Sequence, residues 1–251
     1  MTEYSVDVVI PTWNRGELLC RAVRSVLRQS HVHKIIVVDN GTQRACLSGI
    51  DDERVVVILA EPCIGASAAR NLGVEHSNSP YIAFLDDDDY WQEGFLSRAL
   101  PLFEKGADIV VGRLMREMTP GVLNNYKLLD GSATGLRRLY FSNPGFGGQN
   151  FVIRRDFFLK IDGFDSSMPA SNDRDFAVRA IQAGAEIHVQ PESVAVLCDH
   201  DGVRVRKKQV KGNFRFIMKH WPQMTSRELF VAVKTLIKRF FISNFSKNGI
   251  K

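Results

Sequence analysis

Four consecutive aspartates, Asp86–Asp89, follow an apolar run in the segment YIAFLDDDDYW. Side chains alternate in direction on an extended segment, so Asp86 and Asp88 share one side while Asp87 points away. Two carboxylates on one side suit a hard divalent cation such as Mg²⁺ or Mn²⁺, with positions left open for phosphate oxygens. The alternative is that Asp88 or Asp89 caps a helix that begins near Gln92. A cap explains one aspartate but not four, so we expect a metal site.

Polar residues also follow two earlier apolar runs. The first run ends in IPTWNR, with Pro11, Thr12 and Asn14, and the second ends in VVDNGT, with Asp39. Asp39 can accept a hydrogen bond from a base N–H or a ribose hydroxyl. The alternatives are local turn structure: Thr12 or Asn14 as a helix cap, and Asp39 in an Asx-turn before Gly41.

Three further residues are candidates for chemistry. Arg70, in GASAARNLG, can balance the aspartates or contact a pyrophosphate, or it is a surface arginine. Asp173, in NDRD, is favoured by the dipole at the start of a helix, and is also placed to act as a general base. His200, in LCDHDG, is a candidate third metal ligand or phosphate contact, although a lone histidine is usually structural.

Alternating strands and helices are needed to position these residues. Short β-branched runs separated by amphipathic stretches predict an α/β domain with a mostly parallel sheet, flanked by helices. Ligands bind such sheets at the carboxyl ends of the strands, where Thr12, Asp39 and Asp86 should meet. The predicted strands are 6–10, 34–39, 54–59, 81–85, 108–111, 151–155, 186–189 and 194–197, and the predicted helical stretches are 19–27, 66–76, 92–105, 173–184 and 208–251.

Charge divides the chain into a body and a tail. Residues 203–251 contain thirteen Lys or Arg and one acid, Glu228, whereas the preceding body has an excess of seven acids. We therefore expect one domain over 1–205 and a basic, amphipathic, helical tail over 206–251. Leu229, Val233, Leu236, Ile237, Phe240 and Phe241 form the predicted apolar face of that tail, and Lys234, Lys238 and Arg239 its basic face.

Several classes of protein are disfavoured. The sequence has no G-x-G-x-x-G after a strand and no P-loop pattern. No stretch reaches the roughly 18 apolar residues of a membrane span, and the start MTEYSVDVVIP is not typical of a signal peptide. The four cysteines show no paired spacing, and three of them are expected to be buried thiols of a reducing compartment. A cytoplasmic protein is expected.

The ordered set VVIPTWNR, IIVVDNGT, GASAARNLG, YIAFLDDDDYW, FVIRRDFFLKIDGFDSS, NDRDFAVRAIQAG and DH resembles glycosyltransferase family 2, the inverting nucleotide-sugar enzymes of the GT-A fold. The resemblance covers residues 5–202. It implies a nucleotide-binding half over 1–112 and an acceptor and catalytic-base half over 113–205.

The resemblance also implies roles for individual residues. Pro11, Thr12, Asn14, Asp39 and Arg70 would bind the nucleotide, with Asp39 reading a uracil-like edge. Asp86 and Asp88 would be the outer residues of the D-x-D motif, with Asp86 near the ribose, Asp88 on Mg²⁺ or Mn²⁺ and Asp87 on the nucleotide side. Asp173 would be the base and His200 a ligand of metal or diphosphate. The sequence departs from the family at Asn172, where Glu is more common.

The expected activity is transfer of a sugar, with inversion, from a nucleotide-diphosphate sugar (a UDP-sugar in the commoner case) to a saccharide or lipid-linked saccharide, in bacterial surface polysaccharide or lipopolysaccharide synthesis. The alternatives are a phosphohydrolase with an aspartate nucleophile and a non-catalytic relative that binds nucleotide-sugar. The tail predicts contact with an anionic membrane surface, on the inner face of the cell membrane, and the alternatives are packing on the domain or a dimer contact. Nucleic acid is not an expected partner, because the tail aromatics lie with aliphatic residues.

Overall fold

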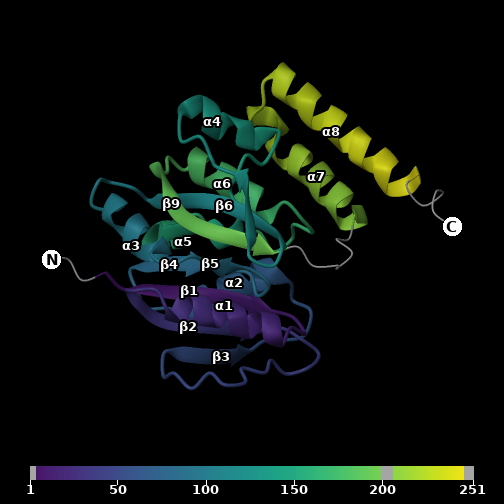
Figure 1. Ribbon diagram of the computed structural model, residues 1–251. Coiled ribbons are helices and arrows are strands. Elements are labelled where there is room, and N and C mark those ends of the chain that lie inside the picture. The colour runs from purple at the N-terminus through teal and green to yellow at the C-terminus, as the bar shows by residue number, and fades with distance from the viewer. Residues whose placement is uncertain (1–3, 199–205, 246–251) are drawn as a thin grey trace.

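The computed structural model describes residues 4–198 and 206–245 of the chain, with side chains described over 4–198 and 208–241. A nine-stranded sheet is covered by helices on both faces, which is the predicted α/β class (Figure 1). The strands are β1 Val6–Thr12, β2 Val32–Asp39, β3 Val55–Leu59, β4 Tyr81–Phe84, β5 Tyr90–Trp91, β6 Ile109–Thr119, β7 Val122–Lys127, β8 Phe151–Arg154 and β9 Ile187–Cys198. The α-helices are α1 Glu17–Leu27, α2 Ala66–Glu75, α3 Phe95–Ala99, α4 Ala133–Arg137, α5 Arg155–Lys160, α6 Asn172–Gln182, α7 Arg206–His220 and α8 Ser226–Phe245.

The central strands are apolar along their length because both of their faces are buried. On β1, Val8 and Ile10 enter the core beneath α1 and α3, whereas Val9 enters the core on the opposite face. A strand buried on both sides has no polar alternation, which is the pattern that predicted a sheet of this kind. The core on the Val9 face of the sheet contains a cluster of phenylalanine rings that packs beneath the candidate site. These are Phe84, Phe146, Phe151, Phe158, Phe164 and Phe176.

The sheet has the order β3-β2-β1-β4-β8-β6-β9-β5, and β7 pairs with β6 as a hairpin. Pairing is parallel from β3 to β4, which is the N-terminal half of the chain. From β4 onward it is mixed, because β8 runs antiparallel to both β4 and β6 while β9 is parallel to β6. The register pairs Thr12 with Asp39, so these two predicted site residues end neighbouring strands at one level.

Three expectations about elements need correction. Strand β3 is at the sheet edge and Val56, Val57 and Leu59 are exposed, so it is not the buried strand that its composition predicted. The two short strands expected at 186–189 and 194–197 form one strand, β9, with an irregularity where it passes Gly112. A Cβ on Gly112 would lie 2.3 Å from the carbonyl oxygen of Ser193, so the backbones approach closely there.

The stretch 92–105 forms less helix than predicted, since α3 is followed by the 3₁₀ helix η1 Leu100–Leu102. Of the cysteines, Cys20 and Cys198 are buried, but Cys46 and Cys63 are exposed; all four are free thiols.

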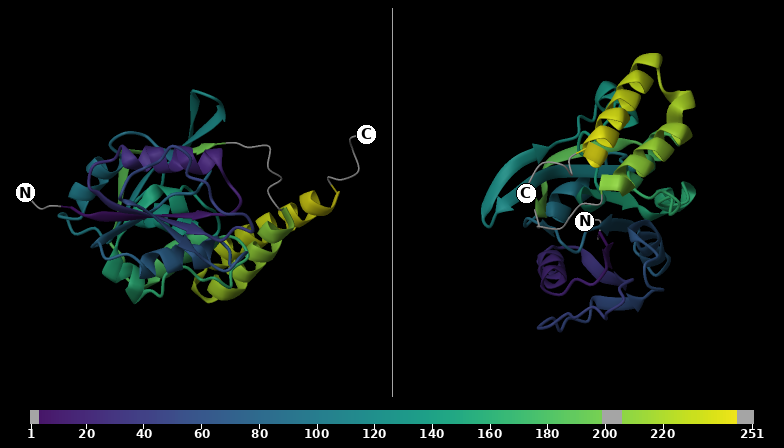
Figure 2. Two further views of the ribbon diagram at one scale, coloured as in Figure 1. Left: turned by 90° about the horizontal axis from the view of Figure 1, so that it is seen from below. Right: turned by 90° about the vertical axis from the view of Figure 1, so that its right-hand side faces the viewer.

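Helices α7 and α8 form a hairpin that packs on the domain and lies beside α4 and α6 (Figure 2). Phe216 of α7 joins the phenylalanine core, and Ala232 of α8 is buried. Arg137 of α4 donates two hydrogen bonds to the carboxylate of Glu228 on α8, each 2.8 Å long. The tail is therefore helical, as expected, and part of it packs on the domain. Within the described residues, no helix has the length and apolar character needed to span a membrane.

Candidate active site

A crevice at the carboxyl ends of β1, β2 and β4 collects most of the predicted residues. Its cavity has a volume of about 450 Å³. Six of its lining residues were predicted from the sequence, from three separate segments. These are Pro11, Thr12, Arg70, Asp86, Asp87 and Asp88.

The four aspartates form a tight turn that brings three of their carboxylates together. The backbone N–H of Asp89 donates to the carbonyl of Asp86, so the chain reverses instead of continuing as a strand. Carboxylate oxygens of Asp86, Asp88 and Asp89 lie within 4.8 Å of one another. Three oxygen ligands at this spacing fit a hard divalent cation such as Mg²⁺ or Mn²⁺. Helix α3 has Gly94 at its N-cap and no side-chain cap, so the capping alternative is wrong.

Asp87 is outside the acidic cluster, as expected, but it lies in a turn and not on the extended segment from which its direction was predicted. Its Oδ2 accepts a hydrogen bond of 2.7 Å from the Thr12 hydroxyl and one of 3.3 Å from the backbone N–H of Trp13. Burial is the main cause that raises the pKa of Asp87 to about 6, and Asp88 and Asp86 raise it further. This residue therefore fixes the end of β1 against the acidic turn.

Arg70 of α2 joins the acidic turn to the start of α6. Its Nη2 lies 2.5 Å from Oδ1 of Asp86, and its Nη1 lies 3.7 Å from Oδ1 of Asp173. The guanidinium lies over the Phe164 ring and only 6% of the side chain is exposed, so its position is fixed by the core. Arg70 is thus not a surface arginine on a small-residue helix.

Asp173 has the surroundings of a general base. Burial raises the pKa of its carboxyl, Arg70 opposes the shift, and Asp86 adds to it. Its Oδ1 has no hydrogen-bond partner among the described residues, although 32% of the side chain is exposed. Oδ1 is buried beside Arg70, and the exposed part of a carboxylate with a raised pKa can take a proton from a hydroxyl group.

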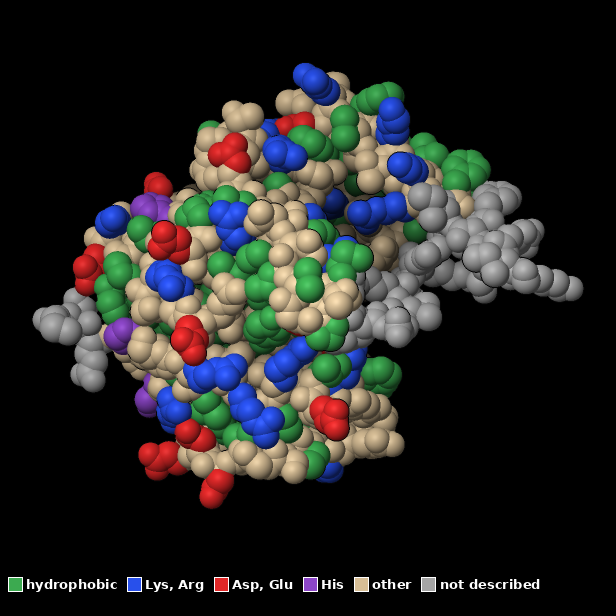
Figure 3. All heavy atoms as spheres, viewed as in Figure 1, with side chains coloured by type: hydrophobic (Ala, Val, Ile, Leu, Met, Phe, Trp, Pro, Cys, Tyr) green, Lys and Arg blue, Asp and Glu red, His purple; other side chains and the backbone are tan. Residues whose placement is uncertain are grey.

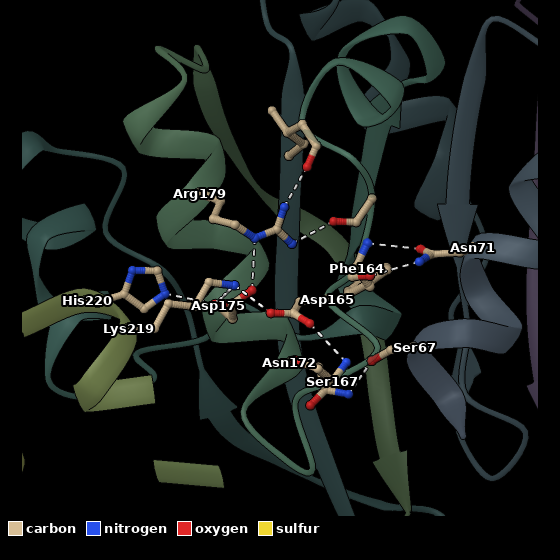
Figure 4. Close-up of polar contacts among 12 residues, drawn as sticks. Ser67, Asn71, Phe164, Asp165, Ser167, Asn172, Asp175, Arg179, Lys219 and His220 are labelled. Carbon is tan, nitrogen blue, oxygen red and sulfur yellow. Dashed lines mark hydrogen bonds and ion pairs between the residues drawn. The ribbon is translucent and has the colours of Figure 1, made fainter. Parts of the chain in front are cut away.

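Neighbouring residues hold α6 in position (Figure 4). Asn172 donates from Nδ2 to the Ser67 hydroxyl on α2, so the residue that replaces the more common Glu makes a neutral contact between the helices. Asp175 is fully buried and its carboxylate contacts Arg179, Lys219 and His220 at 2.8–2.9 Å. Lys219 and His220 belong to α7, so α7 helps to hold α6 in position.

Two predicted nucleotide-binding residues accept hydrogen bonds from backbone N–H groups of the loop after β2. The carboxylate of Asp39 accepts the backbone N–H groups of Gly41 and Ala45, at 3.0 and 2.8 Å, which is the Asx-turn alternative. Oδ1 of Asn14 accepts from the backbone N–H groups of Thr42 and Gln43. Neither residue lines the crevice cavity, and α1 begins after Gly16 without a side-chain cap. His200 lies outside the described residues.

Four residues of the site were not predicted. Trp13 is 53% exposed and lines the crevice, where its ring is available for stacking. Lys208 of α7 lines the same crevice, and Nη2 of Arg15 lies 3.4 Å from Oδ2 of Asp88. Asp89, one of the four aspartates of the predicted metal site but not one of its named ligands, joins the acidic cluster and accepts from the backbone N–H of Cys198. Trp13 and Arg15 are adjacent to predicted residues, whereas only the fold brings in Lys208.

Known proteins are similar to this chain in sequence and in fold. A curated relative, the Escherichia coli K12 glycosyl transferase WcaA, assigned to colanic acid biosynthesis, is 30% identical over 86% of this chain and 81% of its own length. The E. coli UDP-Glc:α-D-GlcNAc-diphosphoundecaprenol β-1,3-glucosyltransferase WfgD is 30% identical over 36% of this chain and 38% of its own. The fold matches residues 1–349 of S. aureus TarS, solved in complex with UDP-GlcNAc, with a TM-score of 0.67 at 14% identity, over 98% of this chain and 76% of that one.

The structural match supports the GT-A fold, and the sequence match establishes the family. The sequence profile described as Glycosyl transferase family 2 matches residues 7–162, which include the acidic turn, Arg70 and the crevice-lining residues other than Lys208. The chain therefore belongs to glycosyl transferase family 2.

Proposed function

We propose that this protein transfers a sugar, with inversion at the anomeric carbon, from a nucleotide-diphosphate sugar to an acceptor hydroxyl. The observation that carries the proposal is the contact of Arg70 with both Asp86 and Asp173. This contact places Asp173, the candidate base, beside the acidic turn. A donor held at the turn and an acceptor hydroxyl held at Asp173 would then meet within one site.

The donor is proposed to be a UDP-sugar bound in the crevice. Trp13 offers a face on which a base stacks, and Arg15, Arg70 and Lys208 surround the acidic turn with positive charge. The TarS structure of the same fold contains UDP-GlcNAc, which supports a uridine nucleotide. Pro11 and Thr12 would shape the base pocket, and the roles of Asp39 and Asn14 stay predictions.

A divalent cation, Mg²⁺ or Mn²⁺, is proposed at Asp86, Asp88 and Asp89. The all-oxygen donor set fits such an ion, and its charge would relieve the repulsion among carboxylates that, together with burial, raises the pKa of Asp89. When bound, it would offset the negative charge that develops on the leaving diphosphate. His200 stays a predicted further ligand.

The proposed step is a single displacement. Asp173 accepts the proton of the acceptor hydroxyl, whose oxygen bonds to the anomeric carbon as the bond from that carbon to the diphosphate oxygen breaks. Because attack comes from the face opposite the leaving group, the configuration inverts. Arg70 orients Asp173 and holds Asp86, and Thr12 holds Asp87 through a hydrogen bond.

The proposed setting is bacterial surface polysaccharide synthesis on a saccharide or lipid-linked saccharide acceptor. WcaA is assigned to colanic acid biosynthesis, and the name of WfgD specifies a diphosphoundecaprenol-linked acceptor. Both relatives support this setting over an unrelated use of nucleotide-sugars.

The experiment is a panel of UDP-, GDP- and dTDP-sugars incubated with the protein, Mn²⁺ and mixed saccharide acceptors, with release of free nucleoside diphosphate as the readout. We expect one donor class to release its nucleotide and only when an acceptor is added. Phosphate release from simple phosphomonoesters would instead favour the phosphohydrolase. Tight donor binding without nucleotide release under any condition would favour the non-catalytic relative.

We also propose that α7 and α8 rest on an anionic membrane at the cytoplasmic face. Figure 3 shows hydrophobic and cationic side chains together over α8, at the upper right of that view. The exposed apolar side chains, from 37% to 68% exposed, are Phe214 and Met218 of α7, Trp221 of the following 3₁₀ helix η4 Trp221–Gln223, and Phe230, Val233, Ile237, Phe240 and Phe241 of α8. Lys234 and Lys238 flank them, which suits anionic headgroups. Leu229 and Leu236, predicted on the same face, are instead partly buried.

Flotation with vesicles of phosphatidylglycerol and phosphatidylethanolamine tests the membrane contact. A triple variant, Phe230→Ser, Ile237→Ser and Phe240→Ser, should stay at the bottom of the gradient while the parent floats. Leu59→Ser at the exposed edge strand, 55% exposed, is the matched control and should float like the parent. Equal flotation of the triple variant would contradict this contact.

A further inference from the structure

A second cavity lies on the other side of Asp173, between α6 and the C-terminal hairpin. Its volume is about 630 Å³, enough to take a sugar with a further group attached. It is lined by Asp173 and by residues of α8, among them Arg239. Asp173 lines this cavity, which we call the acceptor cavity, and Arg70, 3.7 Å from Asp173, lines the crevice assigned to the donor.

Arg174 is a buried cation in the wall of the acceptor cavity. It is 8% exposed, and its Nε is sealed from solvent without a hydrogen-bond partner. Its guanidinium carbon lies 3.6 Å from the centre of the Phe216 ring. No hydrogen bond or ion pair joins it to another described residue, and the nearby Asp175 is already shared by Arg179, Lys219 and His220.

Burying a guanidinium without a hydrogen-bond partner costs free energy unless a bound ligand supplies the missing partner. Burial, and to a smaller degree the positive charge of Arg239, lowers the pKa of Arg174 to about 9. Two arginines thus repel each other across the same space, and an anion bound between them would relieve both the desolvation and the repulsion.

Two more cations reach the cavity from other elements. Lys127 comes from β7, and Arg138 from the 3₁₀ helix η2 Arg138–Tyr140. Together with Arg174 and Arg239 they make four positive side chains, against Asp173 as the one carboxylate among the described lining residues. A neutral saccharide would leave this excess of positive charge uncompensated.

We infer that the acceptor carries a phosphoester or diphosphate group, which Arg174 and Arg239 bind while the acceptor hydroxyl lies at Asp173. The inference rests on the proposed function and names the class of acceptor. A diphosphate matches several convergent cations and the planar fork of an arginine better than a single carboxylate does. The exposed apolar side chains on α8 lie on the same helix as Arg239, where the lipid of such an acceptor would have an apolar surface to follow.

Equilibrium binding of octyl diphosphate tests this directly, with UDP and Mg²⁺ kept saturating so that the crevice is filled. Octyl β-glucoside and octyl β-glucuronide are the neutral and carboxylate comparisons. We expect octyl diphosphate to bind the parent at least tenfold more tightly than either glycoside, with an affinity that falls as salt is raised. Arg174→Met and Arg239→Gln should each weaken it about tenfold or more, since each removes a charge-assisted contact.

The controls separate this site from the donor site and from the fold. Arg28→Gln removes an exposed cation at the end of α1 and should change nothing. UDP affinity should be unchanged in Arg174→Met and Arg239→Gln, and Arg174→Lys should keep part of the binding if Arg174→Met folds poorly. Unchanged octyl diphosphate affinity in both variants, or tighter binding of the glucuronide, would overturn the inference. Failure to release nucleotide from any donor would instead count against the proposed function.

Discussion

Nη1 of Arg70 on α2 lies 3.7 Å from Oδ1 of Asp173 in the first turn of α6. The same guanidinium contacts Asp86, so one buried side chain from α2 reaches both the acidic turn and the start of α6. The proposed base is therefore oriented by a residue of another helix, α2. This relationship makes several expectations concrete.

Removing Arg70 should damage catalysis more than binding of the nucleotide base. Arg70→Met leaves Asp86 and Asp173 without their shared cation, and breaking a buried ion pair costs about 3–5 kcal/mol. We expect kcat at saturating donor to fall by about 10²-fold or more. Arg70→Lys should retain part of the activity lost in Arg70→Met, because lysine keeps the positive charge but not the planar guanidinium that contacts both carboxylates. Steady-state kinetics at saturating donor measure the change, with thermal unfolding to verify folding. A variant with parental kcat would show that Arg70 does not orient the base.

The pH dependence of turnover should report Asp173. Burial raises the pKa of this carboxyl, and only its ionised form accepts a proton, so kcat/KM should fall as the pH decreases through that raised pKa. The acid limb should therefore lie above the value of about 4 for a free aspartate. In Arg70→Lys the limb should move little, whereas in Arg70→Met it should move to higher pH, because the opposing cation is gone. A limb at or below the free-aspartate value would argue against Asp173 as the titrating base.

Asp175 should be a stability residue and not a catalytic one. Its burial acts to raise its pKa, but hydrogen bonds from His220, Lys219 and Arg179 outweigh burial and lower it. A lowered folded-state pKa stabilises the protein above the unfolded pKa, and this contribution is lost as pH falls through the folded value. Asp175→Asn should lower stability by about 3–5 kcal/mol and the Tm by on the order of 10 °C.

Asp165→Asn is the matched control for that variant. Asp165 also pairs with Lys219, at 2.7 Å, but its side chain is 26% exposed. Asp165→Asn should therefore lower the free energy of unfolding by about 1 kcal/mol or less. Thermal unfolding of both variants measures the difference. Equal Tm values for the two would mean that Asp175 does not fasten α7 to α6.

Metal removal should abolish transfer, and the four aspartates should differ in their effects. Asp88→Asn and Asp89→Asn remove members of the acidic cluster, so each should raise the Mn²⁺ concentration for half-maximal activity by about tenfold or more. Asp87→Asn should leave that Mn²⁺ concentration unchanged, because the Asp87 carboxylate accepts a hydrogen bond from the Thr12 hydroxyl and is not part of the acidic cluster. Activity titrated with Mn²⁺ after EDTA treatment measures this. Full activity in EDTA would contradict the metal site.

Much of the fold could be predicted because its signals are local. Apolar runs buried on both faces identified β1, β2 and β4, and the polar residues after them identified the edge where the crevice lies. The expected grouping of Asp86 with Asp88 and without Asp87 agrees with the acidic cluster, although alternation does not explain it. Alternation could not place Asp89, since the chain turns after β4 and the alternation of an extended strand ends there.

The remainder depends on contacts between distant segments. Nothing near His220 or Lys208 in the sequence indicates that α7 returns to Asp175 and to the crevice. Edge strand β3 has the composition of a buried strand, and only its place beyond β2 leaves it exposed. Asp39 shows the opposite case, because the turn after it was recognisable and the structure satisfies its carboxylate within that turn.

The central claim is that Asp173 is the base, and the substitution Asp173→Asn tests it most directly. Transfer by this variant should be measured with saturating donor and acceptor, alongside UDP affinity. The account predicts a loss of about 10²–10⁴-fold in kcat with UDP binding unchanged. A variant that retains the parental rate of transfer would contradict it.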